Sequence, residues 1–317
     1  MTLFNHHNKE SVSQTASFGM RIVFMLLAFL AMLALSACGT SASNSGSNTS
    51  NHNKLVVGSQ DFYENEIVAE IYAQALESQG YEIERSFRIG QREVYMPELE
   101  AGKVDIFPEY TGNLLQYYHP DTAATESQEV YAELVNALPE GLRVLDQAPA
   151  TDADSYVVTK EFADANNIVS IGDLADIEGL VLAGNSELEM RPYGPQGLKE
   201  VYGVEIAQFK PVEDSGGPLT IKALTDGDAT IVDLYSSTPE LAKGKLVVLD
   251  DPKGLFLASH VVPVASSNVD DAAAETINKV SAALSAEELI AMNSESVNEQ
   301  RSSSDIAADF LKRNNLI

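Results

Sequence analysis

The sequence predicts an α/β protein built from two similar lobes. Strand-like and helical segments alternate along its 317 residues, an order that implies a parallel sheet covered by helices. A repeat at an offset of 125 residues supports two lobes, because Leu55–Gln60 matches Leu180–Asn185 and Tyr110–Thr111 matches Tyr235–Ser236. General similarity among α/β units is the alternative explanation. The hydrophobic content of 44% is enough to bury a sizeable core.

The N-terminal segment predicts an export signal. Arg21 precedes an apolar run that is too short to span a bilayer. Leu35–Cys38 places small residues before the only cysteine of the chain and resembles the lipobox of bacterial lipoproteins. We therefore expect a lipoprotein signal peptide over residues 1–37 and a lipidated Cys38 that anchors an exported protein to the cell envelope. An ordinary signal peptide is the alternative, and translation could start at Met1 or Met20.

The first series of strands and helices follows a flexible, Ser/Asn/Gly-rich tether at residues 38–53. Apolar residues between 65 and 79 keep helical spacing, and Gly80 suits the end of that helix. A strand at 104–107 runs into Pro-Glu-Tyr-Thr-Gly at 108–112, which would deliver a tyrosine ring and a hydroxyl to one sheet edge. The other elements expected here are strands at 55–58 and 81–89 and helices at 96–101 and 126–138.

The second half of the chain continues the alternation and ends in helices. Expected strands lie at 156–159, 180–183, 206–210, 229–234, 245–249 and 260–265, with helices at 195–203 and 218–225. The strand at 260–265 contains Pro263, so we expect the proline at a sheet edge or at the strand end. Asp270, Ser285 and Ser302 suit the N-caps of three C-terminal helices.

Charge and missing motifs exclude several function classes. The formal net charge of -27 disfavours nucleic acid as a partner and favours a cationic or zwitterionic one, or simply solubility. The sequence contains no P-loop, Gly-x-Ser-x-Gly, Gly-x-Gly-x-x-Gly or His-Glu-x-x-His motif. One cysteine rules out an internal disulfide and a cysteine-based metal site. We therefore expect neither an enzyme nor a cofactor or metal site.

Leu99–Gly112, which reads LEAGKVDIFPEYTG, closely resembles the glycine betaine/choline/carnitine-type substrate-binding proteins of ABC osmoprotectant importers. The resemblance extends over roughly residues 54–317 and includes Gly58–Ser59, Ser155–Val158, Arg191 and Asp233–Ser237. It implies the type II periplasmic-binding-protein fold, in which two α/β lobes are joined by two crossings of the chain and enclose a ligand cleft. Lobe I would comprise residues 54–154 plus 262–317, and lobe II residues 155–261.

The resemblance also implies a quaternary-ammonium solute as ligand and an ABC permease as partner. A trimethylammonium group has no N–H, so aromatic faces hold it, and we expect a cage of Tyr110, Tyr156 and Tyr235. Arg191 would grip a ligand carboxylate. Further expected ligand contacts, some of which could instead cap turns, are Ser59, Gln60, Thr111 and Ser236.

Two departures from the family pattern leave the solute open. Many relatives carry a lysine near Gln60 and Pro-Pro-Tyr where this chain has Leu257–Ser259. Choline, a bulkier betaine or another compatible solute therefore stand beside glycine betaine, and Tyr193 or His260 could replace the missing tyrosine. A binding protein for another small cation or amino acid, an exported enzyme and a structural lipoprotein are the alternative functions.

Overall fold

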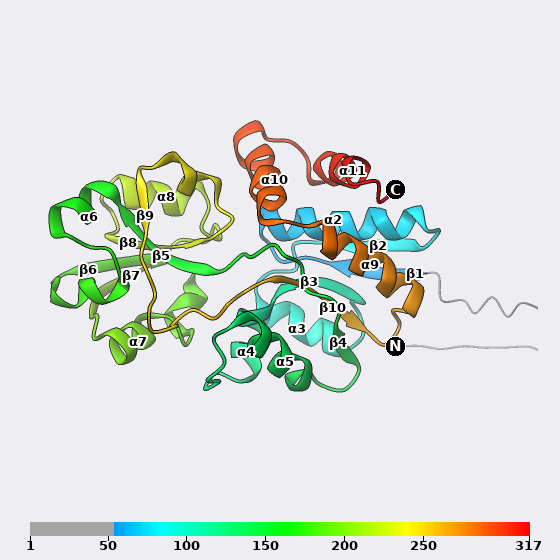
Figure 1. Cartoon of the computed structure of the whole chain (residues 1–317), viewed down its shortest axis with the longest axis horizontal. Helices are drawn as coiled ribbons and strands as arrows, with labels where there is room; N and C mark the ends of the chain where they lie inside the picture. The colour runs from blue at the N-terminus through cyan, green and yellow to red at the C-terminus, as the bar shows by residue number, and fades with distance from the viewer. Residues whose placement is uncertain (1–53) are drawn as a thin grey trace, which may run out of the picture. The chain divides into compact units, whose positions relative to one another are not determined.

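The computed structural model describes residues 54–317, which fold around two five-stranded sheets (Figure 1). The strand orders are β2-β1-β3-β10-β4 and β7-β6-β8-β5-β9. The expectation of an α/β protein is confirmed. The expectation of parallel sheets is wrong in part, because β10 runs antiparallel to β3 and β5 runs antiparallel to β8.

The first sheet is formed by β1 (Lys54–Gly58), β2 (Glu82–Ser86), β3 (Ile106–Tyr110), β4 (Leu142–Val144) and β10 (Val261–Ser266). Its helices are α2 (Tyr63–Ser78), α3 (Arg92–Glu100), α4 (Thr111–Tyr118), α5 (Ser127–Ala137), α9 (Asp271–Ala283), α10 (Ala286–Glu299) and α11 (Ser303–Arg313). The expected N-caps of α9, α10 and α11 are confirmed, since the side chains of Asp270, Ser285 and Ser302 accept hydrogen bonds from backbone amides in the first turn.

The second sheet is formed by β5 (Asp154–Thr159), β6 (Leu180–Gly184), β7 (Ile206–Pro211), β8 (Ile231–Tyr235) and β9 (Leu246–Val248). Around it lie α6 (Lys160–Asn166), α7 (Pro195–Gly197), α8 (Pro218–Thr225) and the short helices η1 (Ile171–Asp176), η2 (Ser186–Met190), η3 (Leu198–Tyr202) and η4 (Pro239–Lys243). The sequence did not predict α4, β4 or α6, which are short elements with little periodicity.

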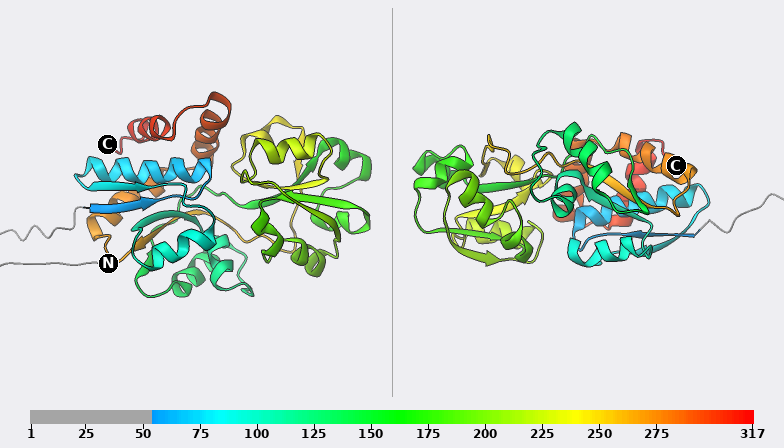
Figure 2. Two further views of the ribbon diagram at one scale, coloured as in Figure 1. Left: turned by 180° about the vertical axis from the view of Figure 1, so that it is seen from behind. Right: turned by 90° about the horizontal axis from the view of Figure 1, so that it is seen from below.

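Each sheet is covered on both faces. Helices α2, α10 and α11 lie on one face of the first sheet, and α3, α4 and α5 lie on the opposite face (Figures 1 and 2). Two separate clusters of buried apolar side chains fill these interfaces. Two further clusters lie on the second sheet, one under α6, η1 and η3 and the other under α8. Burial of apolar surface on both faces therefore stabilises each sheet.

The repeat in the sequence is also a repeat in structure. Strands β1, β2 and β3 occupy the same positions in their sheet as β6, β7 and β8 do in theirs. A side-chain hydrogen bond recurs at equivalent strands. In β1 the Val56 amide donates to Asp105 Oδ2 at 2.9 Å, and in β6 the Val181 amide donates to Thr230 Oγ1 at 3.3 Å. We propose that the two sheets define lobe I, residues 54–154 plus 262–317, and lobe II, residues 155–261, although β5 begins at Asp154 and β10 at Val261.

Strand β3 is longer than the sequence predicted. It includes Pro108, Glu109 and Tyr110, and α4 begins directly at Thr111. Pro108 does not end the strand, because it lies opposite Pro263 of β10 at a position where the two strands exchange no hydrogen bond. The carbonyl groups of both prolines bond elsewhere. The Pro108 carbonyl accepts from Asn65 Nδ2 at 2.9 Å, and the Pro263 carbonyl accepts from the Leu145 amide at 2.8 Å. The missing amide hydrogens therefore cost no bond between β3 and β10.

The expected edge position of Pro263 is wrong. Strand β10 lies between β3 and β4, and Pro263 is in the middle of the strand. The expected signal peptide, the tether and Cys38 lie outside the described residues. Among residues 54–317, no helix combines the length and the apolar character needed to cross a membrane.

Candidate ligand-binding site

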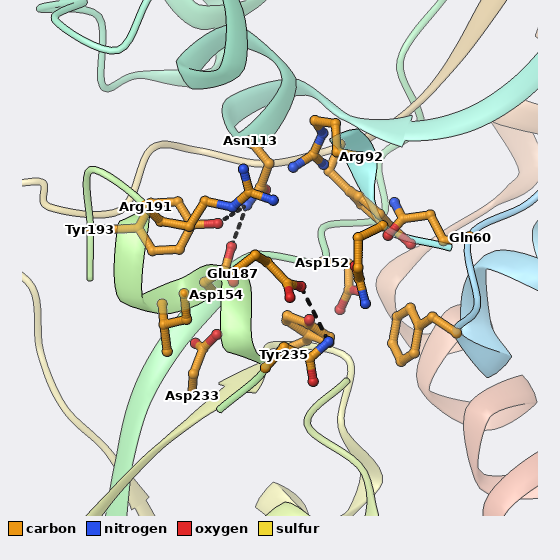
Figure 3. Close-up of a pocket in the computed structure, with 15 residues that line it drawn as sticks. Gln60, Arg92, Asn113, Asp152, Asp154, Glu187, Arg191, Tyr193, Asp233 and Tyr235 are labelled. Carbon is orange, nitrogen blue, oxygen red and sulfur yellow. Dashed lines mark hydrogen bonds between the residues drawn. The ribbon is translucent and has the colours of Figure 1, made fainter. Parts of the chain in front are cut away.

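A cavity lies where β3 and β8 end, and both proposed lobes line it (Figure 3). About 530 Å³ of space between these residues is free of protein atoms, and part of it is open solvent. Lobe I contributes Gln60, Phe62, Arg92, Tyr110, Asn113 and Asp152. Lobe II contributes Glu187, Arg191, Tyr193, Asp233 and Tyr235, and Asp154 lies at the boundary.

Four aromatic rings face this cavity. Tyr110 and Tyr235, at the ends of the equivalent strands β3 and β8, are joined there by Phe62 and Tyr193. The rings of Phe62 and Tyr235 meet edge to face, with centroids 5.0 Å apart. The sequence offered Tyr193 only as one replacement for a missing tyrosine, and it missed Phe62. The signal for Phe62 is its place at the N-cap of α2, just after the first strand.

Polar contacts hold Tyr110 in a single orientation. Its hydroxyl donates to Glu64 Oε2 at 2.5 Å and accepts from Asn65 Nδ2 at 3.0 Å. Burial raises the pKa of Tyr110 well above its ordinary value, and the negative charge of Glu64 raises it further. The side chain therefore stays neutral, and its ring is fixed before any ligand arrives.

Tyr156 does not line the cavity. It is fully buried, and its hydroxyl donates to the Tyr193 carbonyl at 2.6 Å. Both tyrosines also contact Phe256, with ring centroids at 5.0 Å for Tyr156 and 5.4 Å for Tyr193. Tyr156 thus supports Tyr193 from behind, and Tyr193 presents the ring.

Three of the expected hydroxyl contacts also lie away from the cavity lining. Thr111 Oγ1 accepts from the His260 amide at 3.0 Å, and Ser236 Oγ accepts from the Ala153 amide at 3.0 Å. These amides belong to the two segments that connect the sheets. Ser59 Oγ donates to the Gln60 carbonyl at 3.0 Å, within the turn after β1. All three hydroxyls therefore stabilise backbone, which sequence spacing alone does not reveal.

Arg191 and Gln60 do line the cavity. The Arg191 guanidinium donates to both carboxylate oxygens of Glu93, at 2.5 and 3.2 Å, and so links lobe II to lobe I. Gln60 Nε2 is buried and has no hydrogen-bond partner among residues 54–317. A buried donor without a partner costs free energy, so this amide is available to a ligand.

The position of the missing family tyrosine is filled by a polar network. Ser259 Oγ donates to Asn113 Oδ1 at 2.7 Å. Asn113 Nδ2 then donates to the Tyr193 hydroxyl at 3.0 Å and to the Asp154 carboxylate. His260 is not among the residues that line the cavity, and its Nδ1 pairs with the Ala148 carbonyl at 2.8 Å.

Carboxyl groups form the remaining wall of the cavity. Asp152, Asp154, Glu187 and Asp233 line it, and Glu64 lies buried behind. Burial raises the pKa of Asp152 to about 6 and that of Asp233 well above the ordinary range, with the charge of Asp154 adding to the second shift. A concentration of buried acid makes the cavity favourable for a cation. Sequence reasoning could not select these residues among 47 acids.

Comparisons with known proteins agree with this geometry. The model of a family described as the substrate-binding domain of ABC-type glycine betaine transport systems matches residues 53–313. The glycine betaine-binding protein YehZ of Escherichia coli (strain K12) is 28% identical over 273 residues, which cover 81% of this chain and 89% of that protein. The carnitine transport binding protein OpuCC of Listeria monocytogenes is 24% identical over 302 residues, which cover 92% of this chain and 96% of that protein.

Solved structures show the same architecture. A crystal structure described as a glycine betaine/carnitine/choline ABC transporter superimposes with a TM-score of 0.67 at 20% identity, covering 83% of this chain and 99% of that one. The expected type II periplasmic-binding-protein fold is thereby confirmed. Because the family match extends over almost all of the described residues, the chain belongs to the family of substrate-binding domains of ABC-type glycine betaine transport systems.

Proposed function

We propose that this protein is the extracytoplasmic binding component of an ABC importer and that it captures a quaternary-ammonium compatible solute, such as glycine betaine or choline. One observation carries the proposal: Phe62, Tyr110, Tyr193 and Tyr235 line the same cavity as four acidic residues, of which Asp152 and Asp233 are buried. The named relatives are binding proteins for glycine betaine and for carnitine transport.

This lining suits a cation that cannot donate hydrogen bonds. Each aromatic face contributes roughly 0.5–2 kcal/mol to holding a desolvated ammonium group. Those carboxyl groups of the wall that are ionised add a long-range attraction that does not require an N–H donor on the ligand. A small solute thus contacts rings from both lobes at once, which favours domain closure around it.

We assign the sequence-derived site residues different parts in this function. Tyr110 and Tyr235 would contact the ammonium group directly, while Tyr156 acts through Tyr193. The side chains of Arg191 and Gln60 would bind the polar end of the solute. The three hydroxyl residues Ser59, Thr111 and Ser236 would support the turn after β1 and the two crossings between the lobes.

Titration calorimetry tests the proposal. The purified protein is titrated with glycine betaine, choline, carnitine and proline at one ionic strength. We expect heat from at least one quaternary amine and a sharp loss of that heat in Tyr235→Ala. Binding of proline alone would instead indicate a protein for another amino acid, and turnover of any of these solutes would indicate an enzyme.

We also propose that Cys38 is lipidated and anchors the exported protein beside its permease. The lipobox-like Leu35–Cys38 and the apolar run before it support this. Cells that express the protein are labelled with a radioactive fatty acid. We expect the label on the wild-type protein and none on Cys38→Ser, while a labelled Cys38→Ser protein would disprove the anchor.

A further inference from the structure

Arg92 is a charged residue of the cavity that the sequence did not single out. It lies in the first turn of α3, its residue exposure is 6%, and it lines the cavity. Figure 3 shows it on the same side of the cavity as Gln60 and Arg191. A guanidinium stays protonated at any ordinary pH, so this is a permanent positive charge inside the protein.

Glu109 of β3 binds one edge of this guanidinium. Arg92 Nε donates to Glu109 Oε1 at 2.8 Å, and Nη2 donates to Oε2 at 2.9 Å. The Tyr95 hydroxyl and the Tyr110 amide complete the contacts of the carboxylate, at 2.5 and 2.9 Å. Glu109 is thus fully occupied, and it fixes the plane and direction of the arginine side chain.

The second edge of the Arg92 guanidinium, which carries Nη1, is available to a ligand in the cavity. Within residues 54–317, Arg92 Nη1 has no hydrogen-bond partner. The buried Nε2 of Gln60 likewise has none in this part of the chain. Arg191 approaches from lobe II closely enough for the charge of Arg92 to oppose its protonation.

The cavity is therefore polarised. Figure 3 draws Arg92, Gln60 and Arg191 in the upper part of the view and Asp152, Asp154, Glu187 and Asp233 below them, and all seven line the cavity. A simple cation would leave Arg92 Nη1 and Gln60 Nε2 without a hydrogen-bond acceptor. A zwitterion would satisfy both ends, with its ammonium group at the rings and acids and its carboxylate at the arginine corner.

We propose that Arg92, oriented by Glu109, binds the carboxylate of a zwitterionic solute and takes the place of the lysine that many relatives carry near position 60. This inference rests on the proposed function and narrows it to solutes that carry a carboxylate. It would also allow an acidic cavity with a glutamine at position 60 to accept an anionic group.

Arginine is required for this arrangement. Its planar fork offers one edge to Glu109 and a second edge to the ligand at the same time. A lysine at position 92 keeps a charge next to Glu109 but has a single ammonium group, which cannot serve both carboxylates with the same geometry. Arg92→Lys therefore separates ligand binding from the structural ion pair.

The experiment compares two ligands that share a trimethylammonium group. Wild-type protein and Arg92→Lys are titrated by calorimetry with glycine betaine, which has a carboxylate, and with choline, which has a hydroxyl. We expect Kd for glycine betaine to rise about tenfold to a hundredfold in Arg92→Lys and Kd for choline to change less than about threefold. Arg313→Lys, which alters a surface pair with Glu288 on α10, is the matched control and should change neither.

Each other outcome overturns the inference. Equal losses for both ligands would mean that Arg92 only tethers α3 to β3, and unchanged binding would mean that it does not touch the solute. Wild-type protein that binds choline but not glycine betaine would overturn the carboxylate corner and leave the proposed function intact. Wild-type protein that binds neither of them, nor carnitine, would overturn both. Thermal melting of each ligand-free variant checks that a loss of affinity is not a loss of folding.

Discussion

Tyr110 and Tyr235 end equivalent strands, yet their surroundings differ. Tyr110 is 6% exposed and bonds to Glu64 and Asn65, so it belongs to the core of lobe I as well as to the cavity. Tyr235 is only partly buried and contacts the ring of Phe62. The two residues should therefore contribute differently to stability, even if both contact a ligand.

Alanine substitutions separate these contributions. Tyr110→Ala should lower the free energy of unfolding by about 3–5 kcal/mol, because it leaves a cavity and removes a partner of a buried carboxyl group. Tyr235→Ala should cost less than half as much and still weaken solute binding at least about tenfold. Urea unfolding and calorimetry measure the two effects, and equal destabilisation by both variants would contradict this assignment.

Asp152 makes stability depend on pH. Burial raises its pKa to about 6 in the folded protein, above the value of about 3.9 for an exposed aspartate. The folded state thus binds this proton more tightly than the unfolded chain does. The stabilisation that comes from protonating Asp152 is complete below the pKa of the unfolded chain, about 3.9, and it is lost as the pH rises through the pKa of the folded protein, about 6.

The expected result is a pH-dependent difference in the free energy of unfolding between the wild-type protein and Asp152→Asn. Relative to Asp152→Asn, the free energy of unfolding of the wild-type protein should fall between about pH 4 and 6. The side-chain carbonyl in this variant can still accept the Ser237 amide bond that Asp152 Oδ1 accepts, so the fold is preserved. Asp176→Asn, which removes an exposed carboxylate on η1, should show no such slope. A difference that rises with pH would reverse the assigned direction.

At the scale of elements, the two crossings between the sheets are held in the same way. The hydroxyl of Thr111, at the start of α4, binds the segment that leads into β10. The hydroxyl of Ser236, just after β8, binds the segment that leads into β5. Each contact lies at the end of a strand that also carries a cavity tyrosine, so the crossings and the site share their supports.

Removing one hydroxyl tests this support. Thr111→Val keeps the shape of the side chain but leaves the His260 amide without its acceptor, which should cost about 1–3 kcal/mol of stability. Thr276→Val on α9, where the hydroxyl bonds within its own helix, should change stability much less. Chemical unfolding of both variants checks this, and equal effects would show that the crossing does not depend on Thr111.

At the scale of the whole molecule, the cavity lies between two separately packed sheets, those of the proposed lobes I and II. Each sheet has its own apolar clusters, and the single cysteine allows no internal disulfide between the lobes. A solute that contacts both lobes therefore adds a link that the free protein does not have. Ligand that binds only the folded state stabilises it by about 2.7 kcal/mol at a hundred times its Kd.

Thermal melting should show this link directly. Saturating glycine betaine should raise Tm by about 5–10 °C in wild-type protein. Glycine at the same concentration, which lacks the methyl groups, should have little effect. A melting curve that splits into two transitions, with only one shifted by the solute, would mean that the ligand contacts a single lobe.

Local patterns in the sequence determined the order of most strands and helices, the caps of α9 to α11 and the repeat of the two sheets. The elements and caps depend on neighbouring residues, whose spacing is visible in the chain itself, and the repeat is visible when segments 125 residues apart are compared. The motif around Pro-Glu-Tyr-Thr-Gly also pointed to the family that the comparisons then established.

Only the tertiary structure decided which side chains face the cavity. The sequence pointed to Tyr110, Tyr235, Arg191 and Gln60 and offered Tyr193 as a replacement, but it singled out neither Phe62 nor Arg92. Tertiary contacts also decided that the hydroxyls of Thr111 and Ser236 accept hydrogen bonds from backbone amides. They placed Pro263 inside a sheet, opposite Pro108. A binding site depends on contacts between residues far apart in sequence, and these are set by how the sheets pack rather than by any single segment.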